Sequence, residues 1–327
     1  MRSADERCFG RDAVSRVRLP ATVGRSDLPD HVTIWEVGAR DGLQNERSVV
    51  DTATKVEFID RLSAAGLVIV EATSFVRPDR VPQLADAPQV MAGITRRPGV
   101  RYPVLVPNLR GLDAAVQSGV GDIAVFASAT DAFAQRNLGR PMAQQMDMFA
   151  PVITAAREHG FAVRGYVSMC FGDPWEGVVD PQQVIDVCLE LLEVGCTELS
   201  LGDTIGVATP GQVRQLVRGL IGAGASREQI GVHFHDTYGQ ALANTLAALG
   251  EGITTVDSSA GGLGGCPFAE SATGNLATED LLWMLDGLGI ETGVDLDALV
   301  ATSLWMADRL GRPSVSRVVQ ALGKRER

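Results

Sequence analysis

Short apolar runs alternate with longer amphipathic stretches along most of the chain. Eight runs have the length and the aliphatic, β-branched composition of buried strands: 32–37, 67–72, 101–106, 123–127, 162–168, 198–201, 229–233 and 254–258. Between them, apolar residues recur with the period of a helix that buries one face, over 53–65, 112–118, 142–159, 181–194 and 210–222. Two further helical stretches, 278–288 and 296–310, follow the last run. This alternation predicts an α/β fold, a (β/α)8 TIM barrel with extra C-terminal helices.

A doubly wound parallel sheet is the alternative fold. Such a sheet favours a GxGxxG turn after its first strand, and the sequence there is GARDG (38–42). The barrel is therefore preferred. We expect a flexible N-terminal tail over 1–30, a catalytic barrel with its C-terminal helices over 31–312, and a C-terminal tail over 313–327.

Composition and charge exclude several classes of partner. The net charge of −11 and the pI of about 4.9 argue against binding to nucleic acid or to a membrane surface. No apolar run approaches the roughly 20 residues of a membrane span. Because the net charge is negative, an anionic substrate would need arginines close to its binding site.

The expected location is the cytoplasm. Five cysteines show no CxxC spacing, which favours free thiols in a reducing compartment. The first thirty residues balance their arginines with acids, whereas transit peptides are poor in acids.

Two of the four histidines, His233 and His235, are one residue apart at the end of a predicted strand. Alternate residues of a strand point to the same face, so the two imidazoles would lie side by side. Asp236 and Thr237 would then cap a helix over 239–249. The pair at this corner indicates divalent metal binding, while the alternative is two histidines satisfied by hydrogen bonds in the core.

Oxygen ligands are available at two other strand ends. Asp41 follows the first predicted strand, and Asn275 follows the glycine-rich stretch after the last. Two imidazoles with two oxygens suit Mg²⁺ or Mn²⁺ and do not exclude Zn²⁺. The alternatives are a turn or cap role for Asp41 and a Gly-Asn turn for Asn275.

Further polar residues gather where a barrel would have its C-terminal mouth. Arg40 either stabilises a developing oxyanion or pairs with Glu71, and both roles are compatible. Cys266, in a glycine-rich loop, either delivers a proton or is inert. The expected substrate-binding or supporting residues are Gln44, Glu71, Arg164, Tyr166, Ser200, Asp203 and Thr204.

Eight motifs together resemble the hydroxymethylglutaryl-CoA lyase family. They are EVGARDGLQNE (36–46), TSFV (73–76), VPNL (106–109), RGYVS (164–168), SLGDTIG (200–206), VHFHDTYGQ (232–240), GGLGGCP (261–267) and GNLATED (274–280). The resemblance extends over about 32–296. The histidine pair alone is shared with the wider superfamily of metal-dependent lyases and synthases, whereas the cysteine loop and the LQNE continuation favour the lyase branch.

The resemblance implies a reaction and a set of residues. A divalent cation would be bound by Asp41, His233, His235 and Asn275, and the catalytic set would be Arg40, Asp41, His233 and Cys266. The reaction would be retro-Claisen cleavage of 3-hydroxy-3-methylglutaryl-CoA, or a close 3-alkyl homologue, to acetyl-CoA and acetoacetate or its homologue. Such an enzyme would serve leucine degradation or ketone-body formation. We also expect an acyl-CoA partner and a homodimer or higher homo-oligomer.

Two other functions remain alternatives. One is a Claisen-condensing synthase of the same superfamily, similar to isopropylmalate or citramalate synthase. The other is a catalytically silent barrel that binds CoA esters or metal, which the intact ligand set and Cys266 disfavour.

The sequence departs from the family at loops near the expected mouth. Trp175 and Phe268 stand where the family tends to have a phenol, and Glu270 stands where lysine or glutamine is common. Further differences are Ala39 for proline, Asp173 for cysteine and Ser271 for glycine. The three larger changes favour an apolar substrate part, so we expect a 3-alkyl chain longer than methyl to be accepted.

Overall fold

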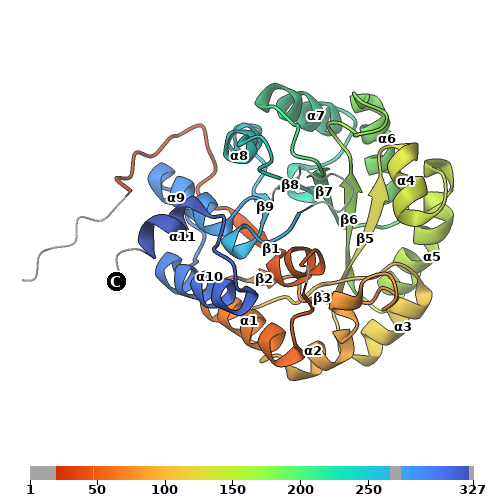
Figure 1. Ribbon diagram of the computed structural model, residues 1–327. Helices are drawn as coiled ribbons and strands as arrows, with labels where there is room; N and C mark the ends of the chain where they lie inside the picture. The colour runs from red at the N-terminus through yellow and green to blue at the C-terminus, as the bar shows by residue number, and fades with distance from the viewer. Residues whose placement is uncertain (1–19, 47, 266–273, 324–327) are drawn as a thin grey trace, which may run out of the picture.

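Nine short strands make one parallel sheet in the computed structural model, which describes residues 20–46, 48–265 and 274–323 (Figure 1). The strands are β1 (Thr33–Glu36), β2 (Ile69–Val70), β3 (Thr73–Ser74), β4 (Val104–Leu105), β5 (Asp122–Ser128), β6 (Ala162–Ser168), β7 (Glu198–Asp203), β8 (Ile230–Phe234) and β9 (Thr255–Ser258). Their order in the sheet is β2-β1-β9-β8-β7-β6-β5-β4-β3. The two edge strands, β2 and β3, are therefore neighbours in sequence.

The segment that contains β2 and β3 closes the sheet into a barrel. β2 pairs with β1, and β3 pairs with β4. Between them, Glu71 N donates to Glu36 O over 2.8 Å, and Ala72 N donates to Pro103 O over 2.9 Å. The predicted strand 67–72 thus lies where it was expected. It extends to Ser74 and pairs with its two neighbours as two short strands, β2 and β3. This closure confirms the predicted (β/α)8 barrel.

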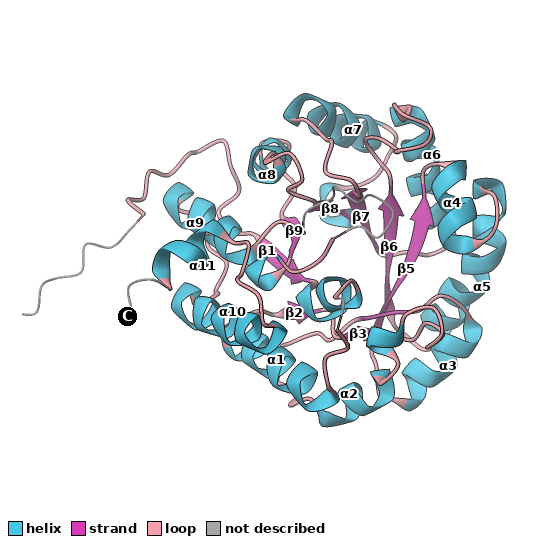
Figure 2. Cartoon of the chain, viewed as in Figure 1, coloured by secondary structure: helices cyan, strands magenta, loops and turns pink. Residues whose placement is uncertain are grey.

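Eleven α-helices lie within the described residues, and Figure 2 shows those between the strands surrounding the sheet. They are α1 (Thr52–Ala64), α2 (Ala87–Gly93), α3 (Leu109–Gln117), α4 (Asp131–Leu138), α5 (Gln145–Glu158), α6 (Pro181–Glu193), α7 (Pro210–Gly222), α8 (Ala241–Leu249), α9 (Thr278–Leu288), α10 (Leu296–Leu310) and α11 (Arg317–Leu322). The sequence analysis missed α2, α4 and α11. Each is eight residues or shorter, so the apolar period repeats too few times to be recognised.

Alternation along the strands turns apolar side chains outward to the helices and brings several polar side chains inside the barrel. In β6, Val163 and Val167 are fully buried in the main hydrophobic core, which the helices complete. Arg164 and Tyr166 alternate with them and point into the barrel, where they meet side chains from other strands. The barrel interior therefore contains polar residues, placed by the register of the sheet, beside apolar ones such as Leu105 and Ala124.

The two ends of the chain pack onto the barrel where the structure describes them. Val23 N donates to Gly287 O over 2.9 Å. Near the other end, the Asp280 carboxylate accepts hydrogen bonds from Ser316 Oγ and Val318 N at the start of α11. Part of the segment expected as a C-terminal tail is thus helical, and the expected domain bounds stay a prediction.

Cys170, Cys188 and Cys196 are buried and free of disulfides. Among the described residues, none of the helices combines the length and apolar character that a membrane crossing requires.

Candidate metal centre at the barrel mouth

His233 and His235 lie side by side at the C-terminal end of β8. Val232 and Phe234 point outward into the apolar core, so the alternation turns both imidazoles inward. Their Nε2 atoms are 3.3 Å apart, and both residues are buried. The prediction that the pair shares one face is confirmed.

The helix after the pair begins later than predicted. α8 starts at Ala241 with Gln240 at its N-cap. Asp236 accepts a hydrogen bond from Ala241 N over 3.0 Å, so its carboxylate supports the first turn without occupying the cap. Thr237 does not cap this helix. Gly239 has a φ of 69°, and this left-handed residue separates Asp236 from the helix.

Asp41 completes a compact group with the two histidines. It follows β1 on a π-helical turn, Gly38–Gly42. One carboxylate oxygen of Asp41 and one nitrogen from each of His233 and His235 all lie within 4.8 Å of one another. Burial alone raises the pKa of Asp41, but the charges of Arg40 and the histidines outweigh it, and the net pKa is lowered.

Asn275 brings a fourth ligand atom to this group. Its Nδ2 donates to Asp41 Oδ2 over 2.8 Å and to Leu263 O over 3.0 Å. Its Oδ1 is buried and accepts no hydrogen bond from any residue that the structure describes. A buried carbonyl oxygen normally has a partner, so this atom is suited to a cation or a hydrogen-bond donor.

The residues present fit a divalent cation. Two imidazole nitrogens, one carboxylate and one amide oxygen converge, and the lowered pKa keeps the carboxylate in the ligating form. Nitrogen and oxygen ligands without a thiolate suit Mg²⁺ or Mn²⁺ and are compatible with Zn²⁺. The sequence-predicted ligand set is thus brought together, and its role is treated below as a proposal.

Arg40 lies beside the group and is held by two carboxylates. Its Nε donates to Glu71 Oε1 over 2.5 Å, and its Nη1 donates to Asp41 Oδ1 over 2.7 Å. Glu71 Oε2 also accepts hydrogen bonds from Trp35 Nε1 and the Tyr166 hydroxyl. Arg40 Nη2 makes no hydrogen bond within the described part of the chain. The expected Glu71 pair exists, and one guanidinium nitrogen stays available.

The remaining predicted residues divide into two groups. Arg164 and Ser200 donate to the carboxylate of Asp257, deep in the barrel. Asp203 instead organises the loop after β7 through hydrogen bonds from Val207 N and Ala208 N, and burial raises its pKa to about 7.

Two other predicted residues, Thr204 and Gln44, make no hydrogen bond to the ligand group within the described part of the chain. Thr204 Oγ1 accepts from Met169 N, which supports the left-handed backbone of Met169 at a φ of 61°. Gln44 is partly buried on the segment after Asp41. The side chain of Gln44 makes no hydrogen bond with any residue that the structure describes.

Asp257 is the site residue that the sequence analysis missed. It lies in β9 and accepts a hydrogen bond from His233 Nδ1 over 3.2 Å. Burial alone lowers the pKa of His233, but the Asp257 contact outweighs it, and the net pKa is raised. The sequence did carry a signal for Asp257, because an acid inside the predicted strand 254–258 is as unusual as Glu71 inside 67–72.

Cys266 lies outside the described residues, as do Phe268, Glu270 and Ser271. The described stem of their loop ends at Gly265, whose carbonyl accepts from Asn45 Nδ2 over 2.9 Å. A Cβ on Gly264 would lie 2.5 Å from Asn275 Nδ2. Glycine at that position is therefore needed for Asn275 to approach the ligand group.

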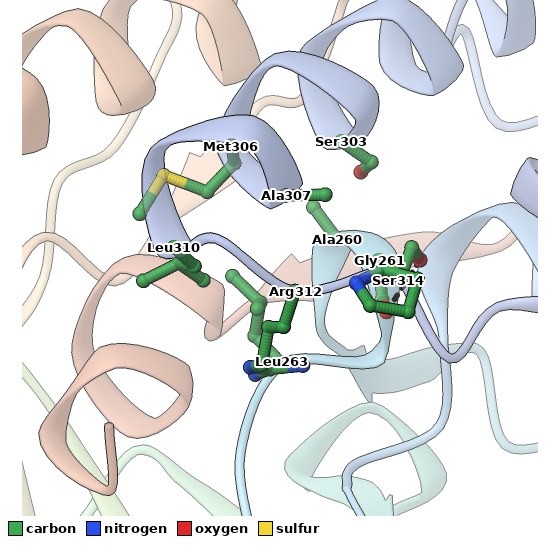
Figure 3. Close-up of a pocket in the computed structure, with 10 residues that line it drawn as sticks. Ala260, Gly261, Leu263, Ser303, Met306, Ala307, Leu310, Arg312 and Ser314 are labelled. Carbon is green, nitrogen blue, oxygen red and sulfur yellow. Dashed lines mark hydrogen bonds between the residues drawn. The ribbon is translucent and has the colours of Figure 1, made fainter. Parts of the chain in front are cut away.

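A small pocket behind this stem is not the substrate site. Figure 3 shows it between Ala260, Gly261 and Leu263 on one side and Ser303, Met306 and Leu310 of α10 on the other. Its volume of about 10 Å³ is that of a single water-sized site. Ser314 Oγ donates to Gly261 O beside it, which ties the C-terminal segment to the stem.

Comparison with known proteins identifies the family. The family model described as HMGL-like matches residues 31–305. A Pseudomonas aeruginosa protein named 3-hydroxy-3-isohexenylglutaryl-CoA/hydroxy-methylglutaryl-CoA lyase is 51% identical over 90% of this chain and 98% of its own.

Two solved structures are also similar. A hydroxymethylglutaryl-CoA lyase from Pseudomonas aeruginosa has a TM-score of 0.89 and 51% identity, over 91% of this chain and 99% of its own. An Acinetobacter baumannii HMG-CoA lyase in complex with coenzyme A and 3-methylmalate has a TM-score of 0.86 and 36% identity, over 91% and 97%. This chain therefore belongs to the HMGL-like family.

Proposed function

We propose that the protein is a divalent-metal-dependent carbon–carbon lyase. Its substrate is 3-hydroxy-3-methylglutaryl-CoA or a close 3-alkyl homologue, and its products are acetyl-CoA and acetoacetate or the corresponding homologue. The observation that carries the proposal is the buried ligand group of Asp41, His233, His235 and Asn275 beside Arg40. The named activity of relatives at 51% identity supports it.

The four ligand residues would hold the cation at the mouth, and Asp41 and His233 belong to the catalytic set for that reason. A divalent cation supplies Lewis acidity, which polarises a bound hydroxyl and lowers its pKa. The substrate's hydroxyl and terminal carboxylate oxygens are the atoms that this site would orient. Mg²⁺ and Mn²⁺ are the preferred ions, with Zn²⁺ as an alternative.

Arg40 would stabilise the leaving acetyl fragment. As the carbon–carbon bond breaks, its electron pair moves onto the thioester and the oxygen there becomes negative. Glu71 and Asp41 hold two of the guanidinium nitrogens, which leaves Nη2 for that oxygen. A guanidinium fixed in advance does not have to reorganise during the reaction.

Cys266 is proposed to return a proton to the acetyl carbon. The substrate loses its hydroxyl proton, forms the ketone and gains a proton at the cleaved carbon, so no oxidant, reductant or water is consumed. This role follows from the family resemblance of GGLGGCP (261–267).

An apolar 3-alkyl chain longer than methyl is proposed to fit the mouth. Trp175, on the loop after β6, is 40% exposed, and the guanidinium of Arg136 lies 4.0 Å from its ring centroid. The name of the Pseudomonas aeruginosa relative includes an isohexenyl substrate together with the methyl one. The substrates in the name of this relative support a broad 3-alkyl specificity.

Cytoplasmic location and homo-oligomerisation are part of the proposal. The buried free thiols of Cys170, Cys188 and Cys196 support a reducing compartment. A role in leucine degradation or ketone-body formation would follow from the reaction and stays a prediction.

One assay tests the reaction against its alternatives. Purified protein is incubated with Mg²⁺ or Mn²⁺ and 3-hydroxy-3-methylglutaryl-CoA, and acetoacetate and acetyl-CoA are measured in equal amounts. Release of free CoA from acetyl-CoA and a 2-oxo acid, without cleavage, would indicate the condensing synthase. Binding of the CoA ester without either reaction would indicate the silent barrel.

A further inference from the structure

Asp257 is a buried carboxylate that receives three hydrogen bonds inside the barrel. Oδ2 accepts from Ser200 Oγ over 2.8 Å and from His233 Nδ1 over 3.2 Å, while Oδ1 accepts from Arg164 Nη2 over 2.6 Å. Asp257 is 1% exposed, and it is the register partner of His233 across β8 and β9. Its position is therefore set by the sheet itself.

The contact with Asp257 determines which nitrogen of His233 carries the proton. A carboxylate oxygen is an acceptor only, so Nδ1 must donate. In a neutral imidazole, Nε2 then has a free lone pair, and Nε2 is the atom 3.3 Å from His235 Nε2. The opposite tautomer would set a lone pair against the carboxylate and place a proton among the ligand atoms.

Arg164 holds the carboxylate from the other side. Its guanidinium carbon lies 3.8 Å from the centroid of the Trp35 ring, and its side chain is 1% exposed. A Cβ at position 231 would lie 2.5 Å from Arg164 Nη2, so Gly231 leaves the space that this guanidinium occupies. The arrangement fixes both oxygens of Asp257 and balances its buried charge.

We infer that Asp257 is a positioning residue for the metal centre. It fixes His233 as the Nδ1–H tautomer and thereby strengthens cation binding by the group of Asp41, His233, His235 and Asn275. Carboxylates that orient a ligating histidine in this way typically strengthen metal affinity by about 10–100-fold. The inference rests on the proposed function only in requiring that this group binds a cation.

The test compares metal-free wild-type protein with Asp257→Asn in titrations with Mn²⁺, followed by isothermal calorimetry and by the electron paramagnetic resonance of free Mn²⁺. We expect the dissociation constant to rise about 10–100-fold. Glu198→Gln is the matched control, because Glu198 approaches Arg164 to 3.8 Å at the far end of β7 and does not contact His233. It should leave the Mn²⁺ affinity unchanged.

A second measurement reads the tautomer directly and needs no variant. The chain has four histidines, so ¹⁵N-histidine labelling gives few signals in a long-range ¹⁵N–¹H spectrum. Metal-free wild-type protein should show His233 protonated at Nδ1, and Asp257→Asn should shift that signal towards the other tautomer. A general loss of packing would not select one imidazole.

The outcomes separate this inference from the proposed function. If wild-type protein binds no Mn²⁺, the metal proposal fails. If wild-type protein binds Mn²⁺ and Asp257→Asn binds it equally well, Asp257 is not the positioning residue. A neutral imidazole of His233 with its proton at Nε2 and not at Nδ1, read in wild-type protein at a pH above the pKa of His233, would overturn the inference even if Asp257→Asn did not fold.

Discussion

Both ends of the barrel hold an arginine shared by two carboxylates, but the described residues bring a group of ligand side chains together only at the mouth. At the N-terminal end, Arg101 Nε lies 3.2 Å from Asp122 Oδ2, and its Nη2 lies 3.0 Å from Glu198 Oε1. The same guanidinium lies 5.2 Å from the centroid of the Trp35 ring. Arg101 is thus shared by two carboxylates, and among the described residues no group of converging His, Cys, Asp or Glu side chains lies at this end.

The mouth adds a group of converging ligand atoms to its shared arginine. Asp41, His233 and His235 converge within 4.8 Å, and Asn275 adds an oxygen that accepts no hydrogen bond from a described residue. Arg40, which lies beside them, is shared between Asp41 and Glu71. Burying acceptors without donors costs free energy, so such a group persists where a bound ligand completes it. We therefore expect the N-terminal end to contribute stability and the mouth to bind the ligand.

Removing the cation should produce the largest effect. EDTA should abolish turnover, and added Mg²⁺ or Mn²⁺ should restore it, because the mouth would lose the charge that its acceptors require. His235→Ala should weaken Mn²⁺ binding and reduce kcat together. Turnover by protein shown by elemental analysis to be free of metal would contradict this expectation.

Loss of Cys266 should affect chemistry without affecting the metal. Cys266→Ala should lower kcat by about 10²-fold or more, the usual effect of removing a general acid, while the Mn²⁺ content stays at the wild-type level. Cys188→Ala is the control, since Cys188 is buried against the helices away from the mouth. An unaltered kcat in Cys266→Ala would show that this thiol is inert.

Substrate choice should show a smaller effect, set by residues that the sequence predicts on loops near the mouth. Apolar Trp175 and Phe268, with acidic Glu270, should favour an apolar 3-alkyl chain, and such contacts are worth about 1–3 kcal/mol each. We expect kcat/KM for a longer 3-alkyl homologue to equal or exceed that for the methyl compound. A preference of about tenfold or more for methyl would contradict this expectation.

A substitution at the N-terminal end of the barrel should change stability alone. Glu198→Gln removes a partly buried partner of Arg101, and we expect a loss of about 1 kcal/mol, or roughly 2–4 °C in Tm. The measurement is thermal unfolding, with kcat and Mn²⁺ affinity as controls that should not change. A tenfold fall in kcat at unchanged Tm would show that the two ends are coupled.

The sequence predicted those parts of the molecule that follow from local periodicity. The histidine pair at spacing two and the long amphipathic helices are properties of a single segment, so α7, α9 and α10 begin and end as predicted. The ligand residues were recognisable because barrel strands bring their C-terminal ends together.

Asp257 could not be assigned a role in the same way. Its importance depends on the register between β8 and β9, which pairs it with His233, and on the space that Gly231 leaves for Arg164. Register is a non-local property, so the sequence showed only an acid in an apolar strand. The short helices α2 and α4 were missed because tertiary packing, more than their own period, stabilises them.

The smallest expected effect concerns two buried carboxylates behind the mouth, Glu36 and Glu279. Burial raises the pKa of Glu36 to about 7 and that of Glu279 to about 8. Glu279 accepts hydrogen bonds from Gly261 N and Ser303 Oγ, and no arginine or lysine of the described residues pairs with it. These carboxyls therefore lack the cationic partners that the acids at the other end have.

A raised carboxyl pKa makes the folded state bind protons that the unfolded state has released. The contribution of Glu279 to stability is complete below its unfolded pKa of 4.5, declines as pH rises, and is lost above about 8. Glu279→Gln keeps a neutral group at all pH values, so the wild-type Tm minus the variant Tm should decrease between pH 5 and pH 8. Thermal unfolding in EDTA at constant ionic strength measures this without a contribution from metal. In Glu228→Gln, the control, the difference should stay constant, because hydrogen bonds from its own backbone and from Ser226 lower the pKa of exposed Glu228 and keep it ionised over this range. A Glu279→Gln difference that grew with pH would mean that the folded protein holds Glu279 as a carboxylate, and that the mouth supplies a positive charge to it.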